Sequence, residues 1–258
     1  MRHGGVSTGN FSSLNPAIYT ADDPARVRRN LELLAEAINL VAEREILAPE
    51  RIIMAHQTHD DRSLIIDGSF LACPAEERKE RLEGVDALIT ALPGVCVSVA
   101  TADCVPVLLY APDRGVVAAV HAGWRGTVAM IAQKTALRMR AEFGCDLARM
   151  RAGIGPSIGP DAFEVGEEVV DAFRAAGFPG RVFRRNAVSG KAHIDLWEAN
   201  RAQLLDAGLL AEHMEVAGIC TYTRHEDYFS ARRLGIRSGR LLSGIFRWPA
   251  CGESAINR

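Results

Sequence analysis

Three side chains in this sequence have the residue types of a catalytic metal centre. His59, Cys104 and His121 lie far apart in the chain, so they do not form the short-range cluster of a zinc finger. Two imidazoles and one thiolate are a donor set that zinc accepts, and three protein ligands leave the fourth tetrahedral position open, as in catalytic zinc sites. The sequence therefore predicts a catalytic metal site, provided that the fold brings these residues together.

A predicted β-hairpin brings two of the three donors together. Two apolar, strand-like runs flank a turn sequence that contains Pro112. Proline fixes φ near about −65°, which excludes the primed two-residue turns and favours a four-residue loop based on a type I turn. With residues 111–114 as that loop, Cys104 lies directly opposite His121, where Cβ atoms are about 4.5–5.5 Å apart. A shift of one residue would place the two side chains on opposite faces of the sheet.

Each of these residues also has a structural interpretation. A single cysteine at the start of a strand is usually a small core residue, and a histidine at a strand end is usually a hydrogen-bonded polar residue. His59 belongs to a polar segment between two predicted strands, and we interpret its neighbour His56 as a solvated turn residue. A nucleophilic interpretation also stays open, in which Cys104 attacks a substrate and His121 acts as its base.

The rest of the sequence alternates helix and strand patterns. A helix should begin after Asp23, with Asp as the N-cap and proline in the first turn. Further helices are predicted over 128–143, 167–176 and 196–207. Strands are predicted over 52–55, 63–66, 87–90, 95–100, 105–110, 116–120, 150–154, 215–219 and 241–246. Such alternation is typical of an α/β (α+β) protein with mixed sheets. We find no repeat or linker, so a single domain is expected over residues 1–258.

The composition excludes several classes of protein. Of the 258 residues, 48% are hydrophobic and 24% are charged, which is ordinary for a globular protein. The net charge of −2 argues against a nucleic-acid-binding surface, and no apolar stretch is long enough to span a membrane. Six scattered cysteines do not make a disulfide framework. We therefore expect a cytoplasmic protein with reduced thiols that binds neither nucleic acid nor membrane; the sequence does not indicate its oligomeric state.

The segments around the three donors resemble those of a known family. They are Gln57–His59, Thr101–Pro106 and His121–Gly126. Further similar segments, spread over essentially the whole chain, are Arg2–Ser7, Ser13–Asn15, Val85–Leu88, Ile154–Pro156, Phe163–Gly166, Cys220–Thr221 and Phe229–Arg233. The sequence resembles the YfiH-like laccase-domain family, whose members are labelled polyphenol oxidase, purine nucleoside phosphorylase or peptidoglycan editing factor.

The resemblance implies a fold, a metal and a reaction. The fold would be a single-domain, four-layer α-β-β-α sandwich, and zinc would be bound by His59, Cys104 and His121. The activity would be that of a purine nucleoside phosphorylase acting on adenosine, inosine and S-methyl-5′-thioadenosine, with additional adenosine deaminase activity. The molecules bound would then be a purine nucleoside and phosphate.

These two reactions need further groups. In deamination, zinc lowers the pKa of a water that attacks C6 of the purine, and a carboxylate must transfer the proton. Asp103 is the first candidate and Asp86 the second, although Asp103 could instead support a ligand or cap a turn.

In phosphorolysis, phosphate attacks C1′ of the ribose. Arg2 and Arg125 could bind that phosphate through their guanidinium groups, and Arg233 is a weaker candidate. Cys104 and Arg2 also count as candidate catalytic residues.

Three other activities stay open at this point. A peptidoglycan-precursor editing hydrolase could use the same zinc site, but it would need a wider and more polar pocket. A cysteine hydrolase would use Cys104 and His121 without a metal. A copper polyphenol oxidase, or laccase, is less favoured, because seven histidines without any His-x-His pair are few for a multi-copper cluster.

Overall fold

The computed structural model describes residues 1–43 and 47–248. Its α-helices are α1 Pro24–Val41, α2 Gly68–Ala72, α3 Ala75–Leu82, α4 Trp124–Val128, α5 Ile131–Phe143, α6 Glu167–Ala175, α7 Leu196–Ala207 and α8 Ala231–Leu234. Short 3₁₀ turns span Gly9–Phe11, Pro49–Arg51, Gly180–Val182 and Ala211–His213. The strands are β1 Ile52–Met54, β2 Ser63–Ile65, β3 Ala87–Thr90, β4 Cys96–Thr101, β5 Val105–Ala111, β6 Val116–Ala122, β7 Arg151–Ile154, β8 Glu164–Val165, β9 Phe183–Arg185, β10 Ala192–Ile194, β11 Met214–Val216 and β12 Leu241–Phe246.

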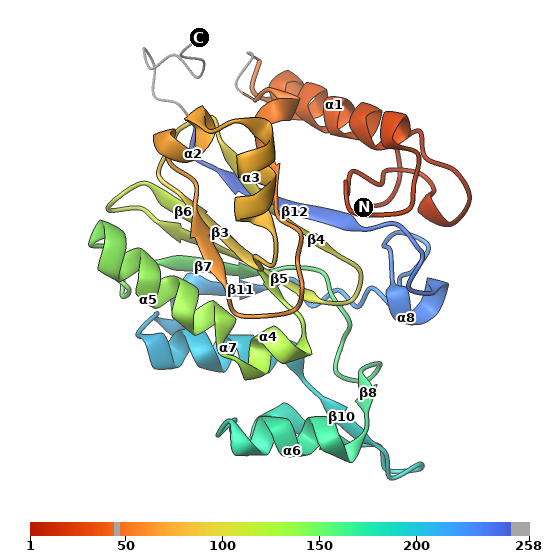
Figure 1. The fold of residues 1–258 in the computed structure, drawn as a ribbon. Coiled ribbons are helices and arrows are strands. Elements are labelled where there is room, and N and C mark those ends of the chain that lie inside the picture. The colour runs from red at the N-terminus through yellow and green to blue at the C-terminus, as the bar shows by residue number, and fades with distance from the viewer. Residues whose placement is uncertain (44–46, 249–258) are drawn as a thin grey trace.

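Two mixed β-sheets form the centre of the molecule (Figure 1). The larger has six strands in the order β11-β7-β5-β6-β3-β2, and the smaller has three in the order β1-β4-β12. A second three-stranded sheet, β8-β10-β9, lies beside α6 at the lower end of the view in Figure 1. The sequence patterns do not predict this last sheet, because its strands are only two or three residues long and alternation needs more residues than that to be visible.

The larger sheet is buried on both faces, as strand β6 shows. Val116, Ala118 and Val120 belong to the core that includes residues of α5 and α7. Val117 and Ala119 alternate with them and pack in a second core with residues of the smaller sheet. Successive side chains of a strand point to opposite faces, so a strand between two cores is apolar throughout. This alternation places the side chain of every second β6 residue between the two sheets.

Helix α1 covers the outer face of the smaller sheet, which completes four layers in the order α-β-β-α (Figure 1). Ile38 of α1 packs with Cys96 of β4 and Phe246 of β12. The helix begins as expected, with Asp23 accepting a hydrogen bond from the backbone N–H of Ala25. The predicted fold class is therefore confirmed, whereas the single-domain organisation stays a prediction. Within the described residues, we find no helix with the length and apolar character needed to cross a bilayer.

The predicted hairpin forms, but its register differs from the expected one. Ala111 pairs with Val116, so the four-residue loop is 112–115 and not 111–114. His121 consequently pairs with Pro106, and the predicted pairing of His121 with Cys104 is wrong by two residues. The turn keeps a type I hydrogen bond, from the Arg114 N–H to the Ala111 carbonyl. Because the shift is two residues, the side chains of Cys104 and His121 remain on the same face of the sheet.

The predicted helix over 128–143 corresponds to α5, which begins three residues later than expected, at Ile131. Helix α4 ends at Val128, and Met130 between the two helices has a left-handed backbone with φ of 62°. The apolar periodicity continues across the break, because both helices pack against the same core, and periodicity alone therefore did not reveal it. The strand expected over 215–219 is also shorter, since β11 ends at Val216.

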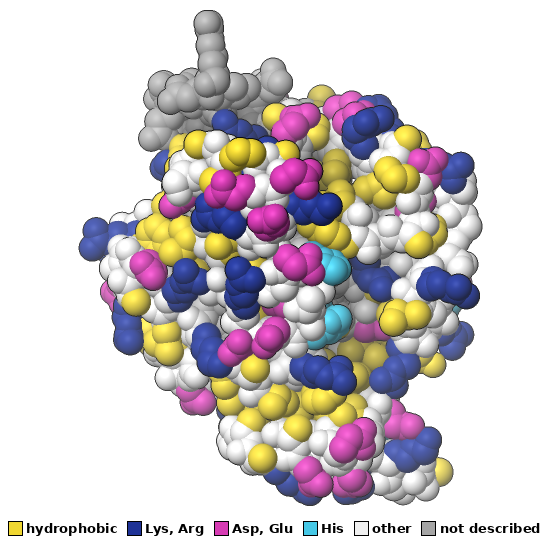
Figure 2. All heavy atoms as spheres, in the orientation of Figure 1, with side chains coloured by type: hydrophobic (Ala, Val, Ile, Leu, Met, Phe, Trp, Pro, Cys, Tyr) yellow, Lys and Arg dark blue, Asp and Glu magenta, His cyan; other side chains and the backbone are white. Residues whose placement is uncertain are grey.

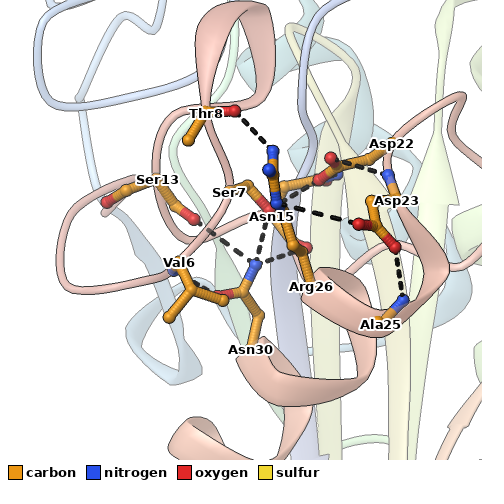
Figure 3. A network of polar contacts seen from close by, with 10 residues as sticks. All are labelled: Val6, Ser7, Thr8, Ser13, Asn15, Asp22, Asp23, Ala25, Arg26 and Asn30. Atoms are coloured by element: carbon orange, nitrogen blue, oxygen red, sulfur yellow. Dashed lines mark hydrogen bonds and ion pairs between the residues drawn. The ribbon is translucent and has the colours of Figure 1, made fainter.

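A network of buried polar side chains attaches the N-terminal segment to α1 (Figure 3). The Asn30 side chain is fully buried and donates to the hydroxyl of Ser7 and to the carbonyl of Asn15, each at 2.9 Å, while it accepts from the Val6 N–H at 2.9 Å. The Asn15 side chain in turn donates to Asp22, at 2.9 Å. This network replaces the hydrogen bonds that an irregular segment cannot make with itself.

Replacing Asn30 by leucine should destabilise the protein strongly. The Val6 N–H and the Asn15 carbonyl would lose their partner, and each unsatisfied buried group costs about 1–3 kcal/mol. We expect the free energy of unfolding, measured by urea denaturation, to fall by roughly 2–4 kcal/mol. Arg28→Leu is the control, because Arg28 lies on the exposed side of the same helix; its effect should stay within about 0.5 kcal/mol. Equal effects of the two changes would contradict this role of the network.

Candidate metal centre

The fold brings the three predicted donors together. One ligand atom from each of His59, Cys104 and His121 lies within 4.8 Å of the other two, and the two imidazole rings are 4.8 Å apart at 74° to each other. Ligands of a tetrahedral zinc ion lie roughly 3.3–3.8 Å apart, given bond lengths of about 2.0–2.3 Å. Small side-chain rotations would therefore let the three atoms share one ion. Figure 2 shows histidine side chains beside a hollow in this face of the molecule.

The three donors come from positions where regular strands begin or end. Cys104 immediately precedes β5, and His121 is the penultimate residue of β6. His59 lies in the loop after β1, and its backbone is left-handed with φ of 67°; Asp103, beside Cys104, has φ of 87°. Non-glycine residues seldom adopt this conformation, and it concentrates at functional sites. The irregular backbone at both positions is thus consistent with a site that the surrounding structure holds in place.

Gly123 leaves space for the three donors. A Cβ atom on this residue would lie 2.9 Å from the His59 ring, 3.1 Å from Cys104 Sγ and 3.8 Å from the His121 ring. The φ of Gly123 is −64°, so glycine is required here by space and not by backbone conformation. Any residue larger than glycine at position 123 would therefore place its Cβ atom in contact with the donors.

Asp86 holds two of the donors in position. Its carboxylate is fully buried and lies 2.6 Å from His121 Nδ1. Because the carboxylate can only accept, Nδ1 carries the proton and Nε2 is left for the metal. The same carboxylate accepts the backbone N–H groups of Thr58, His59 and Asp60, each at 3.0 Å. One side chain thus fixes both the His121 ring and the loop that carries His59.

The electrostatics of the site favour a thiolate. Burial raises the pKa of Cys104, but the charge and hydrogen bonds of His121 and His59 outweigh burial and bring this pKa to about 6. Burial lowers the pKa of His121, but Cys104 and Asp86 outweigh it and raise this pKa to about 9. Burial also raises the pKa of Asp86, but His121 and the backbone N–H groups of the loop more than compensate, so that it lies below its usual value. Without a metal, these shifts describe a thiolate–imidazolium pair, and a bound metal ion would replace the proton on Nε2 of His121.

The donors open into a cavity of about 290 Å³. Much of its lining is apolar and small, and its polar groups come from several separate segments. The lining residues are Ala17, Tyr19, Thr20, Ala55, His56, Gln57, His59, Ala100, Ala102, Cys104, His121, Ala231, Ile236 and Arg240. Sequence analysis missed most of these residues, because alanines and a single tyrosine carry no recognisable motif. Gln57 was visible as part of a family-like segment, and its amide exchanges two hydrogen bonds with the backbone of Ala100.

His56 also borders this cavity, although we predicted a solvated turn residue. Its ring lies 4.7 Å from that of Tyr19 between centroids, and Nδ1 lies 2.6 Å from a Glu83 carboxylate oxygen. The side chain is 43% exposed, so the prediction of a solvated position holds in part. The structure adds that this solvated ring faces the same cavity as the donors.

Asp103 has its carboxylate engaged elsewhere. One oxygen accepts from the Thr221 hydroxyl at 2.7 Å and the other from the backbone N–H of Arg232 at 2.6 Å. Neither Asp103 nor Asp86 is among the residues that line the cavity. These contacts favour a positioning role for both, in which Asp103 joins the start of β5 to the loop before α8. Proton transfer by either carboxylate remains a prediction.

Arg2 serves mainly to fix the N-terminal segment. Its guanidinium donates to the carbonyls of Ser12 at 2.7 Å and His225 at 3.0 Å, and it lies 4.6 Å above the Phe229 ring. Burial lowers its pKa. With these contacts, Arg2 connects the first residues of the chain to the segment before α8, and it does not line the cavity.

The other two predicted phosphate ligands are exposed side chains that stack on aromatic rings. The Arg125 guanidinium lies 4.3 Å from the centroid of Trp124, and that of Arg233 lies 5.4 Å from the centroid of Tyr222. Neither lines the cavity that contains the donors. Arg2, Arg125 and Arg233 are thus absent from the lining of this cavity, and phosphate binding by any of them remains a prediction.

Comparisons with known proteins agree with the geometry. The family model described as multi-copper polyphenol oxidoreductase laccase matches residues 1–248. A purine nucleoside phosphorylase of Bacteroides thetaiotaomicron is 50% identical, over 95% of this chain and 88% of its own length. Adenosine deaminase RL5, from an unknown prokaryotic organism, is 43% identical over 92% of this chain and 88% of its own. The crystal structure of YlmD from Geobacillus stearothermophilus superposes with a TM-score of 0.85, at 34% identity, covering 96% of this chain and 89% of that one.

Proposed function

The chain belongs to the multi-copper polyphenol oxidoreductase laccase family, and from that premise we propose that it is a zinc-dependent purine nucleoside phosphorylase. The observation that carries the proposal is the convergence of His59, Cys104 and His121 on one cavity. The substrates proposed are adenosine, inosine and S-methyl-5′-thioadenosine, together with phosphate. The relatives named purine nucleoside phosphorylase support this choice of reaction.

The donor set supports zinc in preference to a copper cluster. Two imidazoles and one thiolate suit a single tetrahedral ion. In the part of the chain that the structure describes, these three residues form the only group of three or more His, Cys, Asp or Glu side chains close enough to hold a metal. A multi-copper centre would need more donors than this one group contains. The family's description therefore does not by itself assign an oxidase activity to this protein.

The cavity favours a flat, apolar ligand such as a purine. Five alanines and Tyr19 form much of its lining, and small side chains leave a shallow apolar wall against which a planar ring can lie. A peptidoglycan precursor is larger and more polar, so this lining favours it less. The peptidoglycan-editing hydrolase is thus a weaker candidate than the phosphorylase.

The protein's own residues would prepare the site for reaction. Zinc, when bound, would supply a Lewis acid that stabilises developing negative charge and lowers the pKa of a nearby water. The Asp86 carboxylate accepts a hydrogen bond from the Nδ1–H of His121, and this bond fixes the tautomer and the orientation of the ring. In phosphorolysis a phosphate oxygen bonds to C1′ of the ribose as the bond from C1′ to N9 breaks, and the purine leaves with a proton.

Adenosine deamination is a second candidate activity of the same cavity. One relative, 43% identical to this chain, is named an adenosine deaminase. Deamination needs water in place of phosphate and a purine placed with C6 at the metal. A cavity of about 290 Å³ with one metal site would serve for both reactions if the nucleoside binds in two orientations.

Product analysis with adenosine tests the proposal. Protein of measured metal content is incubated with adenosine, with and without phosphate, and the products are separated by chromatography. We expect adenine and ribose 1-phosphate to form only when phosphate is present, because phosphate is the nucleophile. Inosine formed at the same rate without phosphate would assign deamination. Neither product from metal-loaded protein, with inosine and S-methyl-5′-thioadenosine also unchanged, would refute a nucleoside-cleaving function.

A further inference from the structure

The proposed phosphorolysis would be favoured by a cationic side chain that binds phosphate in the cavity, and the three arginines predicted for this role do not line it. Among the described residues that line the cavity, Arg240 is the only Lys or Arg. It immediately precedes β12, and it shares the cavity with Cys104 and His121. We propose that Arg240 binds the phosphate co-substrate next to the metal centre, an inference that rests on the phosphorylase function proposed above.

The guanidinium of Arg240 is held in place by its own loop. Nη1 donates to the carbonyls of Ser238 at 2.7 Å and Gly239 at 3.1 Å, and Nη2 donates to the carbonyl of Ile236 at 2.9 Å. Arginine has five N–H donors, so these bonds leave Nε–H and one N–H of Nη2. A guanidinium that is already fixed loses less entropy when it binds an anion than a freely moving one.

Within the described residues, no Asp or Glu forms an ion pair with this guanidinium, and its hydrogen bonds all go to carbonyl oxygens. Burial lowers the pKa of Arg240, whereas the charges of Cys104 and Asp103 raise it, which places the guanidinium within electrostatic reach of the metal centre. A partly buried guanidinium without a paired carboxylate is suited to bind a small anion, because guanidinium groups form charge-assisted, often bidentate bonds with phosphate.

The buried network of the N-terminal segment fixes the backbone of Arg240. The fully buried Asn15 accepts the Arg240 N–H at its side-chain oxygen, at 3.0 Å, and donates to Asp22 and to the hydroxyl of Thr20. Thr20 lines the same cavity. The N-terminal segment and the residue before β12 are thus joined at the wall of the cavity that the three donors also line.

The test compares Arg240→Gln and Arg240→Lys with the matched control Arg237→Gln. Arg237 lies in the same loop, but its side chain is exposed and does not line the cavity. We expect Arg240→Gln to raise the KM for phosphate roughly 10- to 100-fold, as expected for the loss of hydrogen bonds to a charged group. The KM for the nucleoside and the metal content should stay near wild type. Arg240→Lys, which keeps the charge but not the planar fork, should give an intermediate KM for phosphate.

Phosphate binding is also measured directly, by the rise in melting temperature that inorganic phosphate gives to the metal-loaded protein without nucleoside. This second measurement separates the two proposals. Phosphate should stabilise wild type and Arg237→Gln, but stabilise Arg240→Gln far less, whether or not phosphorolysis is found. An unchanged KM and an unchanged stabilisation in a folded Arg240→Gln protein would overturn the assignment. A larger effect of Arg125→Gln or Arg233→Gln would overturn it in favour of those residues.

Discussion

Replacing Cys104 by serine is expected to remove the metal and the activity together. A hydroxyl is a poor zinc ligand at neutral pH, whereas the Cys104 thiol, with a pKa brought to about 6 by its histidine neighbours, ionises readily. Loss of a residue that merely supports a ligand weakens metal binding about 10- to 100-fold. Loss of the ligand itself should exceed that, so we expect less than about a tenth of the wild-type zinc and a fall in turnover of at least about 100-fold. Elemental analysis and the adenosine assay measure the two quantities on the same sample.

The same substitution tests the alternative in which Cys104 is a nucleophile. The Cys104–His121–Asp86 arrangement is one that a cysteine hydrolase also uses. A cysteine nucleophile does not require His59, however. The side chain of His59 lies beside those of Cys104 and His121 as a third possible metal ligand, which favours the metal site. Full zinc content in an inactive Cys104→Ser protein, or a covalent adduct on Cys104 during turnover, would establish the nucleophile. Cys73→Ser is the control, because Cys73 follows α2 and belongs neither to the metal site nor to the cavity.

Replacing Asp86 by asparagine should have the second-largest effect, even though Asp86 touches neither cavity nor metal position. Asparagine has one acceptor oxygen where the carboxylate has two, and its NH₂ group would face N–H donors in a fully buried place. The His121 ring would lose the partner of Nδ1, and the loop with His59 would lose part of its support. We expect zinc affinity to fall about 10- to 100-fold and the free energy of unfolding to fall by roughly 3–5 kcal/mol.

Competition with a chromogenic chelator measures this affinity, and urea denaturation measures the stability. Asp67→Asn is the matched control. Asp67 caps α2 by accepting the Phe70 N–H, and asparagine caps helices about as well as aspartate, so both quantities should remain near wild type. If Asp86→Asn kept its zinc affinity and lost only turnover, Asp86 would be a proton-transfer group, as the sequence first suggested, and not a positioning residue.

The site depends on segments from both ends of the chain. The metal donors follow or end strands of the central sheets, whereas Tyr19 and Thr20 come from the N-terminal segment and Arg240 from the start of β12. The buried network around Asn30 and Asn15 joins these parts (Figure 3). Substitutions in that network should therefore affect phosphate binding as well as stability.

The sequence itself predicted the candidate metal ligands, from their residue types, and most of the secondary structure, from the periodicity of its apolar residues. The types of the three donors predicted a metal site, because few residue combinations suit zinc, and the fold brings the three side chains close enough to hold an ion. Most of the long helices and central strands were also predictable, since apolar residues recur at the period of each element. Even the hairpin turn was correctly expected to have four residues, because Pro112 excludes the shorter types. These features depend on residues that are neighbours in the chain.

Only the tertiary structure decided which distant residues meet. The apolar alternation of the strands could not decide the hairpin register, because a shift of two residues keeps every side chain on its own face; the structure places the loop at residues 112–115. Asp86 was the second candidate for proton transfer; the strand order buries its carboxylate against His121 and the His59 loop, which favours a positioning role. Arg240 carried no motif, and it reaches the cavity because β12 pairs antiparallel with β4, far away in sequence. Burial and partners of a charged group are set by the packing of whole sheets, and no local pattern encodes them.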